Sequence, residues 1–75
     1  MTSIDLHTFS RKEAEMVLNI QLKNLPSDAS EVVIIHGYHS GTSLRTYVRT
    51  IYTHPRIRSK INSANPGETV FVLRR

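Results

Sequence analysis

The chain has no cysteine and no tryptophan, and only three glycines and three prolines occur among its 75 residues. The lack of cysteine excludes disulfides, thiolate metal sites and cysteine nucleophiles, and is ordinary in a reducing compartment. No apolar run approaches the roughly 20 residues of a membrane-spanning helix. The first residues lack the basic and then apolar pattern of a signal peptide. We therefore expect a cytoplasmic protein that has no membrane partner.

Acidic residues are also scarce, but only in the second part of the chain. Up to Gly37 there are three basic and five acidic side chains, a net charge of −2, whereas from Tyr38 onward there are seven and one, a net charge of +6. This asymmetry indicates a polyanionic partner, RNA or DNA. The alternative is that scattered basic residues form only a solvated surface.

A chain of this length makes one domain, residues 1–75, with a small core. Apolar and polar residues alternate over 4–7, which predicts a short strand with Asp5 and His7 on the same face. A capping box and apolar residues at helical spacing predict a helix over 10–24. The β-branched run that follows, Val32-Val33-Ile34-Ile35, is typical of an inner parallel strand covered on both faces.

The basic part of the chain contains a second helix and two strands. Apolar residues recur at intervals of three and four in the predicted helix, whose buried stripe comprises Leu44, Tyr47, Val48, Ile51 and Tyr52. A His-Pro pair ends this helix. The alternation over 56–61 predicts a strand with one apolar and one basic face, and 69–73 forms a last strand after a turn.

The element order is therefore β-α-β-α-β-β. Right-handed crossovers make the first three strands parallel and leave the fourth to fold back as a hairpin partner. The expected fold class is α/β, an α+β two-layer sandwich with a four-stranded mixed sheet. If the first two strands are neighbours, their carboxyl ends bring Asp5, His7 and His36 into one crevice, where open α/β sheets bind ligands.

These three side chains are the candidate catalytic residues. Asp5 would act as a metal ligand or as a general base for a water attacking phosphorus, with His7 or His36 as acid, metal ligand or electrostatic clamp. Such ligands suit Mg²⁺ or Mn²⁺ better than structural zinc, and we expect no organic cofactor. The alternative is a structural network in which Asp5 holds a histidine tautomer.

The loop after the second strand and the basic side chains are the candidate nucleic-acid contacts. Loop backbone amides would meet phosphate at the start of the second helix, or the loop is a plain turn. Tyr38 would stack on a base or anchor the loop. The third-strand cations would follow a phosphate backbone or protect an edge strand from aggregation. The full set is Gly37, Tyr38, His39, Ser40, Gly41, Arg45, Arg49, Arg56, Arg58 and Lys60.

Two motifs resemble those of the small MutS-related (Smr) domain family. They are Asp5-Leu6-His7 at the end of a strand, and His36-Gly37-Tyr38-His39-Ser40-Gly41, followed by Leu44-Arg45, at the start of a helix. The segment 54–59 is similar to the start of the family's third strand. The chain departs from the family where Thr8 and His39 replace usual glycines. If position 39 needs a positive φ or a close approach to phosphate, His39 would be strained or would obstruct the phosphate. Alternatively, His39 adds an imidazole to the site.

The resemblance covers essentially the whole chain. It implies a fold like the C-terminal domain of translation initiation factor three, nucleic-acid binding and, in several members, endonuclease or nicking activity. No GxxxxGK[ST] segment occurs, which excludes a mismatch-repair ATPase. Our hypothesis is an Smr-like domain that binds RNA or DNA and nicks it by metal-assisted hydrolysis. Two alternatives stay open: a non-catalytic nucleic-acid- or ribosome-binding module, and a protein-interaction domain that dimerises through an open sheet face. Monomer and weak homodimer both stay open.

Overall fold

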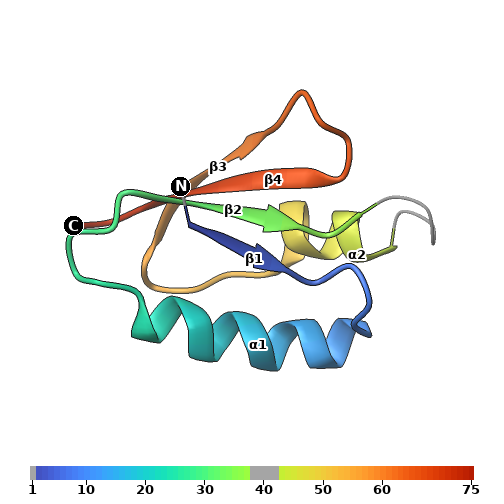
Figure 1. Ribbon diagram of the computed structural model, residues 1–75, viewed down its shortest axis with the longest axis horizontal. Helices are drawn as coiled ribbons and strands as arrows, with labels where there is room; N and C mark the ends of the chain where they lie inside the picture. The colour runs from blue at the N-terminus through green and yellow to red at the C-terminus, as the bar shows by residue number, and fades with distance from the viewer. Residues whose placement is uncertain (1, 38–42) are drawn as a thin grey trace.

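The computed structural model describes residues 2–37 and 43–75, which form a mixed sheet with its helices on one side (Figure 1). The elements are β1 (Ser3–Asp5), α1 (Arg11–Asn24), β2 (Glu31–Ile35), α2 (Ser43–Thr46), the π-helical turn η1 (Tyr47–Ile51), β3 (Ile57–Asn62) and β4 (Glu68–Leu73). This order and layering confirm the predicted fold class.

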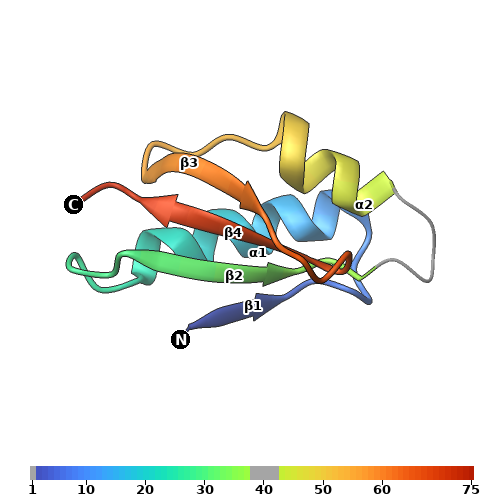
Figure 2. The same cartoon turned by 90° about the horizontal axis from the view of Figure 1, so that it is seen from above.

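The sheet has the strand order β1-β2-β4-β3 (Figure 2). β1 and β2 are parallel neighbours, with Ile4 opposite Ile34. β4 is antiparallel to both β2 and β3, so β3 runs in the direction of β1 and β2. The predicted directions and the β3–β4 hairpin are confirmed, and β4 lies between β2 and β3.

One face of the sheet builds the core against the helices. On that face, Ile4, Val32, Ile34, Phe71 and Leu73 are buried. The alternate residues of β2 and β4 are only half-buried. The prediction that β2 is covered on both faces is therefore wrong. The chain supplies helices for one layer only, and the β-branched run in β2 reflects its central position rather than two-sided burial.

The capping box predicted at the start of α1 is present. Ser10 Oγ accepts a hydrogen bond from the Glu13 amide at 3.1 Å, and Glu13 Oε1 accepts one from the Ser10 amide at 2.8 Å. Both bonds satisfy backbone donors that have no partner within the helix. The buried stripe of α1 consists of Ala14, Leu18 and Leu22. Local sequence thus determines both where this helix begins and which side faces the sheet.

The predicted second helix is α-helical only through Thr46 and continues as the π-helical turn η1. The amide of Tyr52 donates to the carbonyl of Tyr47 at 2.8 Å, a bond that spans five residues. This wider turn places both tyrosines on the buried side, each 4% exposed. Their predicted core position is confirmed. The prediction for Ile51 is wrong, because the wider turn rotates it outward and leaves it 49% exposed.

β3 differs from the predicted strand with one apolar and one basic face. A bulge lies between Ile57 and Ser59, and the extra residue shifts the alternation of side chains beyond it. Lys60 pairs with Phe71 and places its Nζ 5.6 Å from the ring centroid, on the helix-covered side. Ile61 is 51% exposed. The prediction of a continuous basic strand face is therefore wrong.

Candidate functional site

Asp5 and His7 form a hydrogen-bonded pair where β1 ends. Asp5 Oδ1 lies 2.6 Å from His7 Nδ1 and also accepts a hydrogen bond from the His7 amide at 3.0 Å. The bond with the His7 side chain lowers the pKa of Asp5. Because a carboxylate can only accept, Nδ1 carries the proton and Nε2 is the acceptor of the neutral ring. About half of each side chain is exposed, so the pair is accessible to a ligand.

His36 follows the adjacent strand β2, but its side chain points into the helix-covered side. It lies two residues after the buried Ile34 and is 2% exposed. Both ring nitrogens are bonded within the protein: Nδ1 is 3.0 Å from the Gly37 carbonyl oxygen, and Nε2 is 2.8 Å from Thr69 Oγ1. Burial and then the charges of Arg49 and Arg45 lower the pKa of His36, which favours the neutral ring.

The two strand ends meet, yet the three predicted catalytic side chains do not form one group. The Leu6 amide donates to the Ile35 carbonyl at 2.7 Å, which holds the strand ends together. Asp5 alternates with buried residues of β1 and faces the uncovered side, whereas His36 faces the helices. Within residues 2–37 and 43–75, no three histidine or carboxylate side chains gather closely enough to hold a metal ion.

Gly37 is the point at which β2 becomes the predicted phosphate-binding loop. Its φ of +72° lies in the left-handed region, and a Cβ at this position would lie 3.2 Å from the Cβ of His7. The amides of His36 and Gly37 both donate to the Gly67 carbonyl at 2.9 Å. Glycine is therefore required for conformation and for close approach to His7. The predicted contacts Tyr38, His39, Ser40 and Gly41 lie outside the described residues.

The two predicted arginine contacts nearest the strand ends differ in their surroundings. Arg45, in α2, is half-buried and close enough to His36 to influence its pKa. Arg49 donates through Nε to Thr69 Oγ1 and through Nη2 to the Glu68 carbonyl, both at 2.8 Å. The Arg49 guanidinium is thus committed to the fold, which leaves Arg45 as the better candidate for an anion.

The cations predicted for the third strand lie away from the joined ends of β1 and β2: Arg56 precedes β3, Arg58 lies near its start, and Lys60 is level with Val32 of β2. Arg56 donates to the last carbonyl oxygens of α1 and of the turn after it, at 2.7 to 2.8 Å. Lys60 donates to the carbonyl of Tyr52. Arg58 is exposed, whereas the other two are half-buried, and Arg58 lines a hollow with the exposed Arg74 and Arg75. β3 is an edge strand, as the alternative interpretation required.

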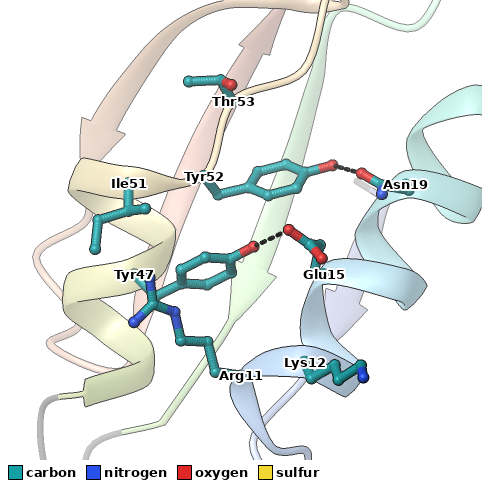
Figure 3. A pocket seen from close by; sticks show the side chains of 8 residues that line it. All are labelled: Arg11, Lys12, Glu15, Asn19, Tyr47, Ile51, Tyr52 and Thr53. Atoms are coloured by element: carbon teal, nitrogen blue, oxygen red, sulfur yellow. Dashed lines mark hydrogen bonds between the residues drawn. The ribbon is translucent and has the colours of Figure 1, made fainter.

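The sequence interpretation missed two cations beside the strand end of β1. Arg11 and Lys12 form the first turn of α1 and line a groove between α1 and η1 (Figure 3). The Arg11 guanidinium lies 4.7 Å from the Tyr47 ring centroid. They were missed because they belong to the part of the chain with net negative charge. Their position four and five residues after His7 was the available signal.

The tyrosines of this groove are structural. The Tyr47 hydroxyl donates to Glu15 at 3.3 Å, and the Tyr52 hydroxyl donates to Asn19 at 2.7 Å (Figure 3). Burial, more than the nearby Tyr47 and Glu15, raises the pKa of Tyr52 to about 12. Both hydroxyls connect the segment 47–52 to α1, so the cationic side chains of this groove are those of Arg11 and Lys12.

A family model described as the Smr domain matches residues 4–70, which is 67 of the 75 residues. The match spans both strand ends and both helices. Neither the curated proteins nor the solved structures provide a significant match. In the described parts of the chain, none of the helices has the length and apolar character needed to cross a membrane.

Proposed function

The chain belongs to the Smr domain family of nucleic-acid-binding domains, and from this we propose that it binds RNA or DNA at the joined ends of β1 and β2 and nicks it there. The observation that carries the proposal is the exposed Asp5–His7 pair, with its 2.6 Å contact, beside the Gly37 turn. A carboxylate that orients an imidazole supports general-base chemistry on a phosphodiester.

In the proposed reaction, His7 Nε2 takes a proton from the attacking water while the water oxygen forms a bond to phosphorus. The bond from phosphorus to the leaving oxygen breaks, and that oxygen takes a proton from solvent. Asp5 keeps the His7 ring oriented and stabilises the imidazolium that forms. His36 takes no part in the proton transfer, because both of its ring nitrogens are bonded inside the fold.

Positive charge at this end of the sheet supports phosphate binding. Arg11 and Lys12 lie at the start of α1 and Arg45 lies in α2. These elements are the next along the chain after the two strand ends, and we propose that their cations contact the nucleic-acid backbone where it passes from Asp5 and His7 over the edge of the domain. Such contacts neutralise phosphates and position the strand without reading its sequence.

We propose Mg²⁺ or Mn²⁺ as the metal, with Asp5 as its one protein ligand. The described residues provide no group of three suitable side chains. An ion held by Asp5 alone would complete its coordination with substrate phosphate and water, as Mg²⁺ commonly does. When bound, it would neutralise charge that develops on the phosphate oxygens.

A second candidate function is nucleic-acid binding without chemistry. It is favoured by one observation: Asp5 Oδ1 is already occupied by two donors, both from His7, which is also the arrangement expected for a purely structural pair. In that case the same cations bind phosphate, and the Asp5–His7 hydrogen bond only maintains the local structure.

Cleavage and binding assays separate these functions. Supercoiled plasmid and a structured RNA are incubated with wild type, Asp5→Asn, His7→Gln and the control Asp28→Asn, each with Mg²⁺, Mn²⁺ or a chelator. Asp28 is exposed in the loop after α1, so the control removes the same charge elsewhere. The proposal expects cleavage by wild type and the control only, with binding kept by all four. Salt-sensitive binding without cleavage supports the second function, and absence of binding at low salt refutes both.

A further inference from the structure

A chain of hydrogen bonds runs through the interior behind the strand end of β2. Arg49 Nε is 2.8 Å from Thr69 Oγ1, Thr69 Oγ1 is 2.8 Å from His36 Nε2, and His36 Nδ1 is 3.0 Å from the Gly37 carbonyl oxygen. Thr69 is fully buried and His36 is almost so. The other buried side chains of residues 2–37 and 43–75 are apolar or tyrosine. Buried polar groups persist where they are hydrogen-bonded.

The direction of each bond follows from its end groups. The Gly37 carbonyl can only accept, so His36 Nδ1 carries a proton. The Arg49 guanidinium can only donate, so Thr69 Oγ1 accepts from it. A neutral His36 then presents a bare Nε2, which accepts the one hydroxyl proton of Thr69. The opposite tautomer would turn the Nδ1 lone pair toward the Gly37 carbonyl oxygen, which is repulsive.

We propose that Thr69 and Arg49 are positioning residues that hold His36 in its Nδ1–H tautomer, through which His36 anchors Gly37 against His7. Among the residues of this hydrogen-bonded network, Gly37 is the one next to the reacting pair, because a Cβ at position 37 would lie 3.2 Å from the Cβ of His7. His36 and Arg49 thus support the site from behind, and neither contacts the nucleic acid.

This role explains why β4 carries a threonine where its neighbours on the same face are apolar. Phe71 and Leu73 follow Thr69 at alternate positions, and both are buried apolar side chains. A valine at 69 would fill the same volume, so packing alone does not require a hydroxyl. The hydroxyl is needed because it both accepts from Arg49 and donates to His36.

The expected effect on nucleic-acid binding and nicking rests on the proposed function, whereas the expected tautomer of His36 does not. The test therefore begins with ¹⁵N NMR of the imidazoles in wild type, Thr69→Val, Thr69→Ser and the control Thr50→Val. Thr50 donates to the Thr46 carbonyl at an exposed position, so the control removes a hydroxyl elsewhere. We expect His36 of wild type, Thr69→Ser and the control to be Nδ1-protonated, and Thr69→Val to show both tautomers and a shifted Gly37 amide.

The second measurement is affinity for a structured RNA and for plasmid DNA. Thr69→Val should weaken binding or slow nicking by roughly twofold to tenfold, the range of one ordinary hydrogen bond, and Thr69→Ser should restore it. An Nε2-protonated or mixed wild-type ring overturns the proposal. Binding and nicking by Thr69→Val equal to wild type overturn it as well. A wild type with the expected tautomer that binds neither polymer refutes the proposed function and leaves the tautomer assignment standing. Arg49→Gln serves as a second variant if Thr69→Val fails to fold.

Discussion

Replacing Gly37 by alanine tests the junction between the strand end of β2 and the Asp5–His7 pair. At φ +72° an L-residue with a Cβ costs roughly 1–2 kcal/mol. The new Cβ would also lie 3.2 Å from the Cβ of His7, so one backbone must shift by a few tenths of an ångström. We expect Gly37→Ala to lower the free energy of unfolding by about 2 kcal/mol. In a domain of this size each kcal/mol lowers Tm by about 4–8 °C.

Asparagine at position 37 distinguishes backbone strain from contact with His7 as the cause of the destabilisation. It tolerates the left-handed region better than alanine but introduces the same Cβ. If backbone strain dominates, Gly37→Asn recovers most of the lost stability in urea unfolding. If the contact with His7 dominates, both variants are equally destabilised and both weaken nucleic-acid binding. A Gly37→Ala protein as stable as wild type would show that neither the backbone conformation nor the approach to His7 disfavours a side chain at position 37.

Three further predictions follow from single contacts. Because the pKa of His36 is lowered in the folded state, the unfolded chain binds a proton more readily than the folded protein. The free energy of unfolding in urea should therefore be constant above about pH 6.5 and fall as the pH decreases below that value. A His36→Gln variant whose stability has the same pH dependence as wild type would contradict this. Arg56→Ala should lower the free energy of unfolding in urea by about 2 kcal/mol, because the carbonyls at the end of α1 lose a charged donor. Its affinity for nucleic acid, compared at equal concentrations of folded protein, should stay at the wild-type level. Arg11→Gln and Lys12→Gln should each reduce the slope of log affinity against log salt by about one, and slopes equal to wild type would place the phosphates elsewhere.

Local patterns in the sequence predict much of this fold. The capping box at Ser10, the alternation around Asp5 and the helical spacing of α1 each depend on neighbours within a few residues, and all three are confirmed. Strand direction follows from the handedness of crossovers, which also holds here. The family resemblance is confirmed by the match over residues 4–70.

The wrong predictions concern side chains that lie beyond an irregularity in a helix or a strand, which shifts the regular repeat. The π-helical turn rotates Ile51 out of the core, and the bulge in β3 moves Lys60 to the covered side. Neither departure has a strong local signature, because each is stabilised by contacts with distant elements. The Lys60 ammonium, for example, donates to the Tyr52 carbonyl beyond η1.

The sequence predicts only part of the candidate site. Adjacent positions at the ends of parallel strands bring Asp5 and His7 beside Gly37, as the sequence indicated. Whether His36 joins them depends on which face its side chain takes. The alternation that buries Ile34 also buries His36, so counting residues from the core would have placed it apart from Asp5.

The most direct test of the central claim is an NMR titration of ¹⁵N-labelled protein with a short single-stranded RNA and the matching DNA. We expect the amide shifts to gather on Asp5, His7 and Gly37, with Arg11 and Arg45 beside them, and the His7 Nε2 resonance to move. Shifts that gather instead around Arg58, Arg74 and Arg75, at the far end of the sheet, would contradict it.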